Sequence, residues 1–335
     1  RVVLLLGATE TIAPYAEAYA HYIFIAAPFM ICSFIMNNLL RFQGKASFAM
    51  VGITVGGLLN IALDPLFIFT LDMGTAGAAL ATGLSQFISF CILLWMCNHQ
   101  DSCISISIRK FRPKLAIYRE VLYGGIPSLG RQGIASVATI LMNFMCQPYG
   151  DAAIAAMSIV SRFMFFINSV IIGFGQGFQP VCSYCFGAGL YNRVKKACWF
   201  CIRVSTIILL VLSVISFPAA RSIITLFRRN DPTVIEIGTL ALRLQLITLP
   251  LQGAVIMGNM MPQSIGYGFR ATLVSTARQG IFLIPLLTIM TYTIGLLGIQ
   301  CAQPLADIAT FILSLFVIRG IFKEFPEDAS SFAAQ

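Results

Sequence analysis

The sequence predicts an all-α polytopic membrane protein built from two pseudo-symmetric six-helix lobes, of which the first is incomplete. Three observations lead to this prediction. Apolar residues make up 58% and charged residues only 10% of the 335 residues, whereas soluble domains carry about a quarter charged residues. Nine apolar stretches are long enough to cross a bilayer. Residues 28–44 and 74–90 also recur in similar form about 220 residues later, which indicates an internal repeat.

The nine predicted spans follow one another with mostly short connections. They cover residues 16–36, 48–70, 75–97, 121–146, 153–180, 197–219, 236–259, 271–292 and 296–320. Two longer polar stretches interrupt them, a basic linker and a second loop, at residues 98–120 and 220–235. We therefore expect four parts, namely the end of the first lobe, the linker, a second six-helix lobe and a polar tail. Their expected bounds are 1–97, 98–120, 121–322 and 323–335.

Lys and Arg residues gather in every second loop, which predicts the orientation of the chain by the positive-inside rule. The enriched loops follow the spans 16–36, 75–97, 153–180, 236–259 and 296–320. The opposite side has only Arg1, Arg221, Arg228 and Arg229, and the rule does not explain the pair Arg228–Arg229. We expect the linker and the C-terminus to be cytoplasmic. These loops also explain the net charge of +9 without a nucleic-acid partner.

The internal repeat relates the first three spans to the last three. At an offset of 222 residues, Pro28, Asn37 and Gly44 meet Pro250, Asn259 and Gly266. At an offset of 221, Gly74, Gly77, Ala81 and Phe90 meet Gly295, Gly298, Ala302 and Phe311. The fourth to sixth spans have no such partner, so we expect three further helices, about 100 residues, before Arg1. Both copies start on the same side of the membrane, which makes the repeat parallel.

An acidic residue at membrane depth is by default a candidate for function. Asp64 ends a stripe in which Gly52, Gly56, Asn60 and Asp64 recur every four residues and therefore share one helix face. Glycines allow a neighbouring helix or a ligand to come close. Asn60 can share a proton, an ion or a water molecule with Asp64. Pro65 has no N–H, which frees a backbone acceptor near the carboxylate.

The stripe predicts an ion-coupling site at Asp64 and Asn60 that faces the interior of the lobe. Burial penalises the charged form of a carboxylate, so such a group can hold a proton and release it when water or a cation arrives. The alternative is a structural Asp64–Asn60 pair that fixes helix packing. Asp307 lies in a second stretch that Pro304 interrupts, with Gln303 as its nearest polar neighbour at helical spacing. A coupling role and a structural role both remain open for Asp307.

Further polar side chains lie within apolar stretches, where contact with lipid would be costly. They are expected to line a substrate cavity or to pair with one another within a lobe, and the two alternatives stay open. The set comprises Asn37, Asn38, Arg131, Gln132, Arg162, Gln176, Gln179, Arg278 and Gln279.

The four cysteines of two CxxC pairs raise the question of a metal site. Cys182 and Cys185 precede Cys198 and Cys201 at a spacing that resembles a zinc site. The first pair closes one apolar stretch and the second opens the next, so we expect two helix-end pairs and no metal. No Walker A, GxSxG or HExxH pattern occurs, which argues against an enzyme.

Several longer stretches resemble one known family. "NNLLRFQGKASFAM", "GGLLNIALDPLFIF" and "GTAGAALAT" in the first part are similar to multidrug and toxic compound extrusion (MATE) transporters, within them to the bacterial DinF-type branch. "GIPSLGRQG", "GFGQGFQPVCSYCFGAGLYNRVKKA" and "QPLADIATF" in the second part agree. The resemblance extends over essentially the whole chain.

The resemblance implies a twelve-helix fold with a central cleft between two lobes. It implies efflux of cationic or amphipathic drugs in exchange for H+ or Na+, without a cofactor, by a monomer in the bacterial plasma membrane. The Asn–Asp pair of the family's fifth helix falls on Asn60 and Asp64. A further family acid belongs to the first helix, which this chain does not contain. The alternatives are a lipid or lipid-linked oligosaccharide flippase, an ion channel, or an inactive fragment.

Overall fold

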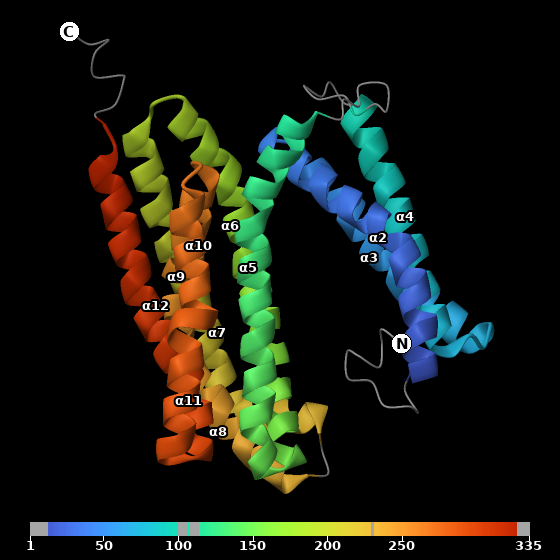
Figure 1. Ribbon diagram of the computed structural model, residues 1–335, viewed down its shortest axis with the longest axis vertical. Coiled ribbons are helices and arrows are strands. Elements are labelled where there is room, and N and C mark those ends of the chain that lie inside the picture. The colour runs from blue at the N-terminus through green and yellow to red at the C-terminus, as the bar shows by residue number, and fades with distance from the viewer. Residues whose placement is uncertain (1–12, 100–105, 107–113, 229–230, 327–335) are drawn as a thin grey trace. The chain divides into compact units, whose positions relative to one another are not determined.

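The computed structural model describes residues 13–99, 106, 114–228 and 231–326 (Figure 1). These residues fall into two compact units, the first before position 113 and the second from position 114 on. The regular elements of the described residues are all helical. This agrees with the predicted all-α class.

The described residues of the first unit form three long helices. Its elements are α2 (Ala13–Phe42), α3 (Ala46–Pro65), a π-helical turn η1 (Leu66–Thr70) and α4 (Gly74–His99). Helix α4 packs along both α2 and α3. Met36, Leu40, Ala49 and Leu93 form the centre of its small core.

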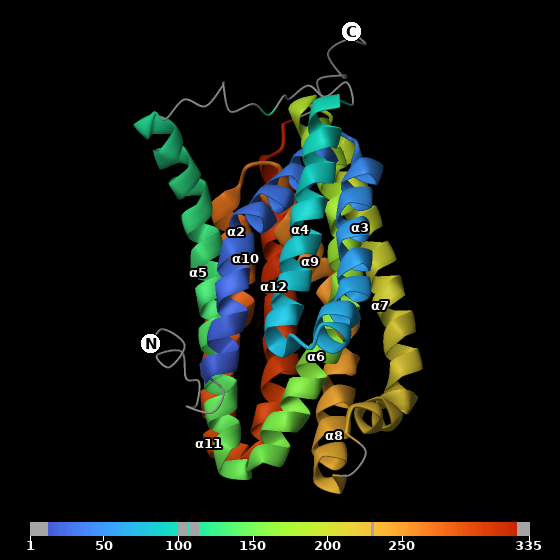
Figure 2. The ribbon, with the colours of Figure 1, turned by 90° about the vertical axis from the view of Figure 1, so that its right-hand side faces the viewer.

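The second unit is a larger up-and-down bundle (Figures 1 and 2). Its first elements are α5 (Leu115–Cys146), a 3-10 turn η3 (Gln147–Tyr149), α6 (Asp151–Gly187) and α7 (Tyr191–Phe227). Then follow α8 (Pro232–Thr248), a 3-10 turn η4 (Leu249–Leu251), α9 (Gln252–Ser264) and α10 (Gly268–Thr276). A π-helical turn η5 (Ala277–Phe282), α11 (Leu283–Ile294) and α12 (Leu296–Glu324) complete it. One apolar core joins α6, α7, α8, α9 and α12.

Eight helical segments of the described residues are long and apolar enough to cross a membrane. The fourth predicted span, 121–146, lies inside the helix α5, which is not among these eight segments of the described residues. Helix α4 ends at His99, and α5 begins at Leu115, inside the predicted linker 98–120.

The predicted polar loop at 220–235 was too long. Helix α7 continues to Phe227, and α8 already begins at Pro232. The side chain of Asp231 accepts hydrogen bonds from the backbone N–H groups of Thr233 at 3.2 Å and Val234 at 3.3 Å. This N-cap, followed by a proline at the first helical position, starts a helix early. The polarity of these residues therefore reflects helix ends outside the apolar run.

The internal repeat is present in three dimensions. Asn37 Nδ2 donates to the carbonyl of Ala49 at 2.8 Å, and Asn259 Nδ2 donates to the carbonyl of Ala271 at 2.6 Å. Donors and acceptors are both 222 residues apart.

The turns that follow these asparagines also match. Gly44 and Gly266 have φ angles of +79° and +86°, in the left-handed region that glycine adopts without strain. The two copies therefore share the same helix–turn–helix connection.

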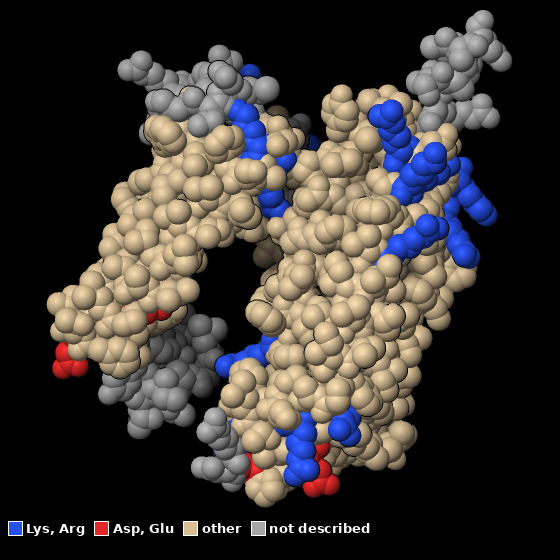
Figure 3. Space-filling model, turned by 180° about the vertical axis from the view of Figure 1, so that it is seen from behind, with Lys and Arg blue, Asp and Glu red and all other residues tan. Residues whose placement is uncertain are grey.

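The charged residues of the second unit gather at its two ends, with a largely uncharged band between them on the face drawn in Figure 3. The α6–α7 and α9–α10 turns lie at the same end as the C-terminus of α12 (Figure 1). The basic residues in or next to these elements are Arg193, Lys195, Lys196, Arg270, Arg319 and Lys323. Arg221 lies in the last turns of α7, and Arg228 is its C-cap, at the other end. Within this unit, the basic loops thus share one end.

Candidate functional site

The glycine stripe of α3 lies against α4, inside the first unit. Gly52 and Gly56 are buried, and a Cβ atom at either position would collide with α4. At Gly52 it would meet the side chain of Leu93, and at Gly56 it would lie 2.9 Å from Ser89 Cβ. The hydroxyl of Ser89 donates to the carbonyl of Gly52 at 2.9 Å. Ile61, in contrast, is 70% exposed. The stripe therefore faces the interior of the unit, as predicted.

Asp64 lies at the end of this helix–helix seam, in a small polar cluster. Asn60 Nδ2 lies 3.1 Å from Asp64 Oδ1 and 3.4 Å from the hydroxyl oxygen of Thr82 on α4. The Thr82 hydroxyl donates its own hydrogen to the carbonyl of Ala78 at 3.0 Å, so it faces Asn60 as an acceptor. All three side chains are half-buried. The cluster thus combines one carboxylate with amide and hydroxyl oxygens, the ligand type that hard cations prefer.

Of the residues that the structure describes, none places a cationic group within ion-pair distance of Asp64. Its carboxylate interacts with the neutral amide of Asn60 instead. A half-buried carboxylate in this setting can change its charge without leaving a protein cation unpaired.

The helix that carries Asp64 changes character directly after it. Helix α3 ends at Pro65 and continues as the π-helical turn Leu66–Thr70, whose end is marked by a bond from the N–H of Leu71 to the carbonyl of Leu66 at 3.0 Å. Proline disrupts the regular α-helical ladder, and π-helical turns occur frequently at functional sites. The helix geometry therefore changes locally at Pro65, next to the acid.

Asp307 is held quite differently, in the core of the second unit. It is 1% exposed and accepts three side-chain hydrogen bonds. Gln252 Nε2 on α9 donates to Oδ2 at 2.8 Å, while Arg278 Nε in η5 and Gln303 Nε2 on α12 donate to Oδ1 at 2.8 and 3.1 Å. The contact with Arg278 is also an ion pair. Asp307 thus joins three helices, and its charge is balanced.

Asn37 and Asn38 make contacts within the first unit. Asn37 uses its amide group to bond the carbonyl of Ala49, as described above. Asn38 Nδ2 donates to the carbonyl of Phe34 at 2.8 Å, and its oxygen accepts a short bond from Arg41. Both amides therefore serve the end of α2 and its turn.

The other predicted cavity residues are not brought to Asp64 or Asp307 by any contact of the described residues. Gln179 Nε2 lies 3.4 Å from Gln263 Oε1. Arg162 and Gln132 are exposed, and Gln176 and Gln279 are half-buried. The side chain of Arg131 lies outside the described residues. Of the side chains of this set that the structure describes, only Arg278 joins a candidate acid.

The four cysteines of the CxxC pairs are buried on α6 and α7 with reduced thiols. Among the residues described, no three His, Cys, Asp or Glu side chains form a group that could hold a metal ion.

The sequence did not single out two members of these clusters, Thr82 and Gln252. Thr82 pairs with Asn60 across two helices, and Gln252 reaches Asp307 from 55 residues away. The repeat held a signal for the first, since Thr82 and Gln303 are 221 residues apart. Thr82 and Gln303 thus occupy equivalent positions in the last helix of their copies. Thr82 lies in the polar cluster of Asp64, and Gln303 donates to Asp307.

Comparison with known proteins places the chain in a family. It matches the MatE family over residues 2–66 and 127–294. It is 27% identical over 328 residues to the multidrug export protein MepA of Staphylococcus haemolyticus, which covers 98% of this chain and 72% of the relative.

Solved structures show the same fold. A MATE protein crystallised with MaL6 has a TM-score of 0.88 at 24% identity, over 95% of this chain and 72% of the other. The outward-facing conformation of a multidrug resistance MATE family transporter has a TM-score of 0.87 at 25% identity, over 96% and 72%. Because the family match extends over more than half of the sequence, the chain belongs to the MatE family of multi-pass membrane transporters.

Proposed function

We propose that the protein exports cationic or amphipathic organic compounds in exchange for H+ or Na+, with Asp64 as the coupling acid. The observation that supports this role most directly is the polar cluster of Asp64, Asn60 and Thr82, which contains no countercharge among the described residues. The relative from Staphylococcus haemolyticus is named a multidrug export protein, which supports the substrate class.

The proposed mechanism is alternating access by rocking of two lobes. Outside, Asp64 takes up H+ or Na+ through its carboxylate, with Asn60 and Thr82 offering further oxygen atoms. Neutralising the carboxylate changes how α3 lies against α4, with the π-helical turn after Pro65 as the point that bends. This change favours drug release. Inside, Asp64 gives up its ion, and a drug enters from the cytoplasm or the inner leaflet.

Asp64 is preferred over Asp307 as the coupling acid on electrostatic grounds. Protonating Asp307 would leave the charge of Arg278 without its partner in the interior of the bundle, which is costly. Protonating Asp64 has no such consequence for the residues around it. Asp307 is therefore proposed to stabilise the second lobe.

The proposed orientation places the basic ends of the helices and the C-terminus in the cytoplasm of a bacterial cell. The support is the shared end of the basic loops in the second unit, together with the positive-inside rule. In this orientation Asp64, near the far end of α3, is fed from outside.

The test is the variant Asp64→Asn in the whole protein, assayed by efflux of an ethidium-type dye against its gradient. We expect normal expression and loss of ion-driven efflux. Asp72→Asn is the matched control, because Asp72 is exposed in the connection to α4 and its φ of +51° suits asparagine. Unchanged efflux by Asp64→Asn would contradict the assignment. Transport of lipid-linked oligosaccharide instead of dye by the parent protein would favour a flippase.

A further inference from the structure

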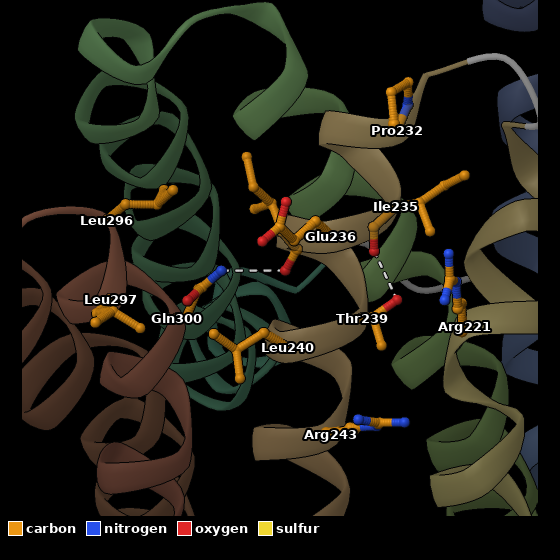
Figure 4. Close-up of a pocket in the computed structure, with 11 residues that line it drawn as sticks. Arg221, Pro232, Ile235, Glu236, Thr239, Leu240, Arg243, Leu296, Leu297 and Gln300 are labelled. Carbon is orange, nitrogen blue, oxygen red and sulfur yellow. Dashed lines mark hydrogen bonds between the residues drawn. The ribbon is translucent and has the colours of Figure 1, made fainter.

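A cavity of about 770 Å³ lies at the end of the second unit opposite the basic loops. It is formed by the last turns of α7 and the first turns of α8 and α12 (Figure 4). Arg221 and Arg243 lie on one side of α8, and Gln300 lies with Leu296 and Leu297 on the other. The cavity thus wraps around the first turns of α8 and is open to the surroundings of the bundle. It lies entirely within the second unit, and Asp307 is not among its lining residues.

The two arginines lie close to the end of the apolar run of α7. The Arg243 guanidinium is 5.5 Å from the centre of the Phe217 ring. Phe217 lies near the end of the apolar run 197–219, and Arg221 follows this run by two residues. Long basic side chains at such positions place their charge among lipid headgroups while their stems cover apolar surface.

The charges of the cavity favour an anion. Of the residues that line it, Arg221 and Arg243 are basic and Glu236 is acidic. Neither arginine forms an ion pair with a described residue. The guanidinium group binds phosphate through its planar set of donors. One excess positive charge suits a phosphodiester, which carries a single negative charge.

We propose that this cavity binds an anionic phospholipid such as phosphatidylglycerol. The phosphodiester lies between Arg221 and Arg243. The acyl chains leave along Leu240 and Leu297, two exposed apolar residues of the cavity. Glu236 limits the site to a single negative charge. The bound lipid connects α7, α8 and α12 at their ends.

The experiment measures lipid binding to the purified protein in detergent by native mass spectrometry. The parent protein is compared with the double variant Arg221→Gln/Arg243→Gln and with both single variants. Each guanidinium is expected to contribute about fivefold to the affinity for phosphatidylglycerol, and the pair about twentyfold. Arg203→Gln is the matched control, since Arg203 is an exposed arginine that lies outside the cavity on α7, the helix that carries Arg221.

Two further ligands test whether binding requires both the negative charge and the acyl chains of the lipid. Phosphatidylcholine, which has no net charge, is expected to bind weakly to every variant. Soluble glycerol phosphate is expected to bind weakly because it has no acyl chains. Equal lipid binding by the parent and the double variant would overturn the proposal, as would an equal loss in Arg203→Gln. Tight binding of glycerol phosphate would also overturn it, in favour of a soluble phosphate ligand.

Discussion

Arg278 Nε lies 2.8 Å from Asp307 Oδ1, and this ion pair distinguishes Asp307 from Asp64. The charge of Asp307 is balanced by Arg278, and its carboxylate also accepts hydrogen bonds from the amides of Gln252 and Gln303. Asp64 has the amide of Asn60 beside it and no cation among the described residues. The same residue type thus lies in two different settings, an ion pair in one unit and a neutral polar cluster in the other.

The first prediction concerns the stability of the Asp307–Arg278 pair. Removing one partner of a buried ion pair leaves the other charge uncompensated, at a cost of about 3–5 kcal/mol. We expect Asp307→Asn and Arg278→Gln each to lower the thermal midpoint of the purified protein clearly. The double variant should lose less than the sum of the two, because it leaves no single charge behind. Strictly additive losses in a double-mutant cycle would contradict a direct pair.

The outcome for these clusters shows what a sequence can predict. The stripe from Gly52 to Asp64 was readable because all its members are on one helix, where spacing fixes the face. Thr82 and Gln252 were not found, because contacts between helices depend on how the helices pack, which spacing along one helix does not encode. Asp307 remained ambiguous for the same reason, since its partner Arg278 belongs to a different helix.

The second prediction concerns Thr82, whose hydroxyl faces the amide of Asn60 at 3.4 Å. Thr82→Val keeps the shape of the side chain but removes the oxygen. If this oxygen orients Asn60 for the coupling ion, the concentration of H+ or Na+ that half-saturates dye efflux should rise by roughly tenfold in Thr82→Val. This factor corresponds to the free energy of about one hydrogen bond. Thr82→Ser retains the hydroxyl and should behave as the parent. An identical ion dependence of all three proteins would show that Thr82 has no such role.

The third prediction concerns two glycines that the repeat relates, Gly77 and Gly298. A Cβ atom on Gly77 would lie 2.7 Å from the carbonyl oxygen of Phe67, and one on Gly298 would collide with the carbonyl of Met290. Backbone atoms cannot move aside as a side-chain end can. Gly77→Ala and Gly298→Ala should therefore each destabilise the protein by about 1–3 kcal/mol.

Gly57→Ala is the control for these two variants. Gly57 is an exposed residue in the middle of α3, and an added Cβ meets no atom within 4 Å. Alanine favours the helix over glycine by about 0.8–1.0 kcal/mol, so this variant should be as stable as the parent or more so. A loss of thermal stability in Gly57→Ala similar to that of the other two would show that the effect is not one of close backbone contact.

The fourth prediction tests whether the repeat is equivalent in energy as well as in geometry. Asn37 and Asn259 each donate across a turn to a backbone carbonyl, that of Ala49 or Ala271. Replacing either asparagine by aspartate keeps its size but exchanges the donor for an acceptor that repels the carbonyl. Since an unpaired buried carbonyl costs about 1–3 kcal/mol, both variants should lower thermal stability, and Asn→Ala at each position should do so to a similar or smaller extent.

Because the two turns share the bond and the left-handed glycine, the losses of thermal stability should be alike in both copies. If substitution of Asn259 lowers the thermal stability and substitution of Asn37 does not, the hydrogen bond stabilises the turn of the second unit alone. The matching bond of Asn37 would then contribute nothing to the stability of the first unit.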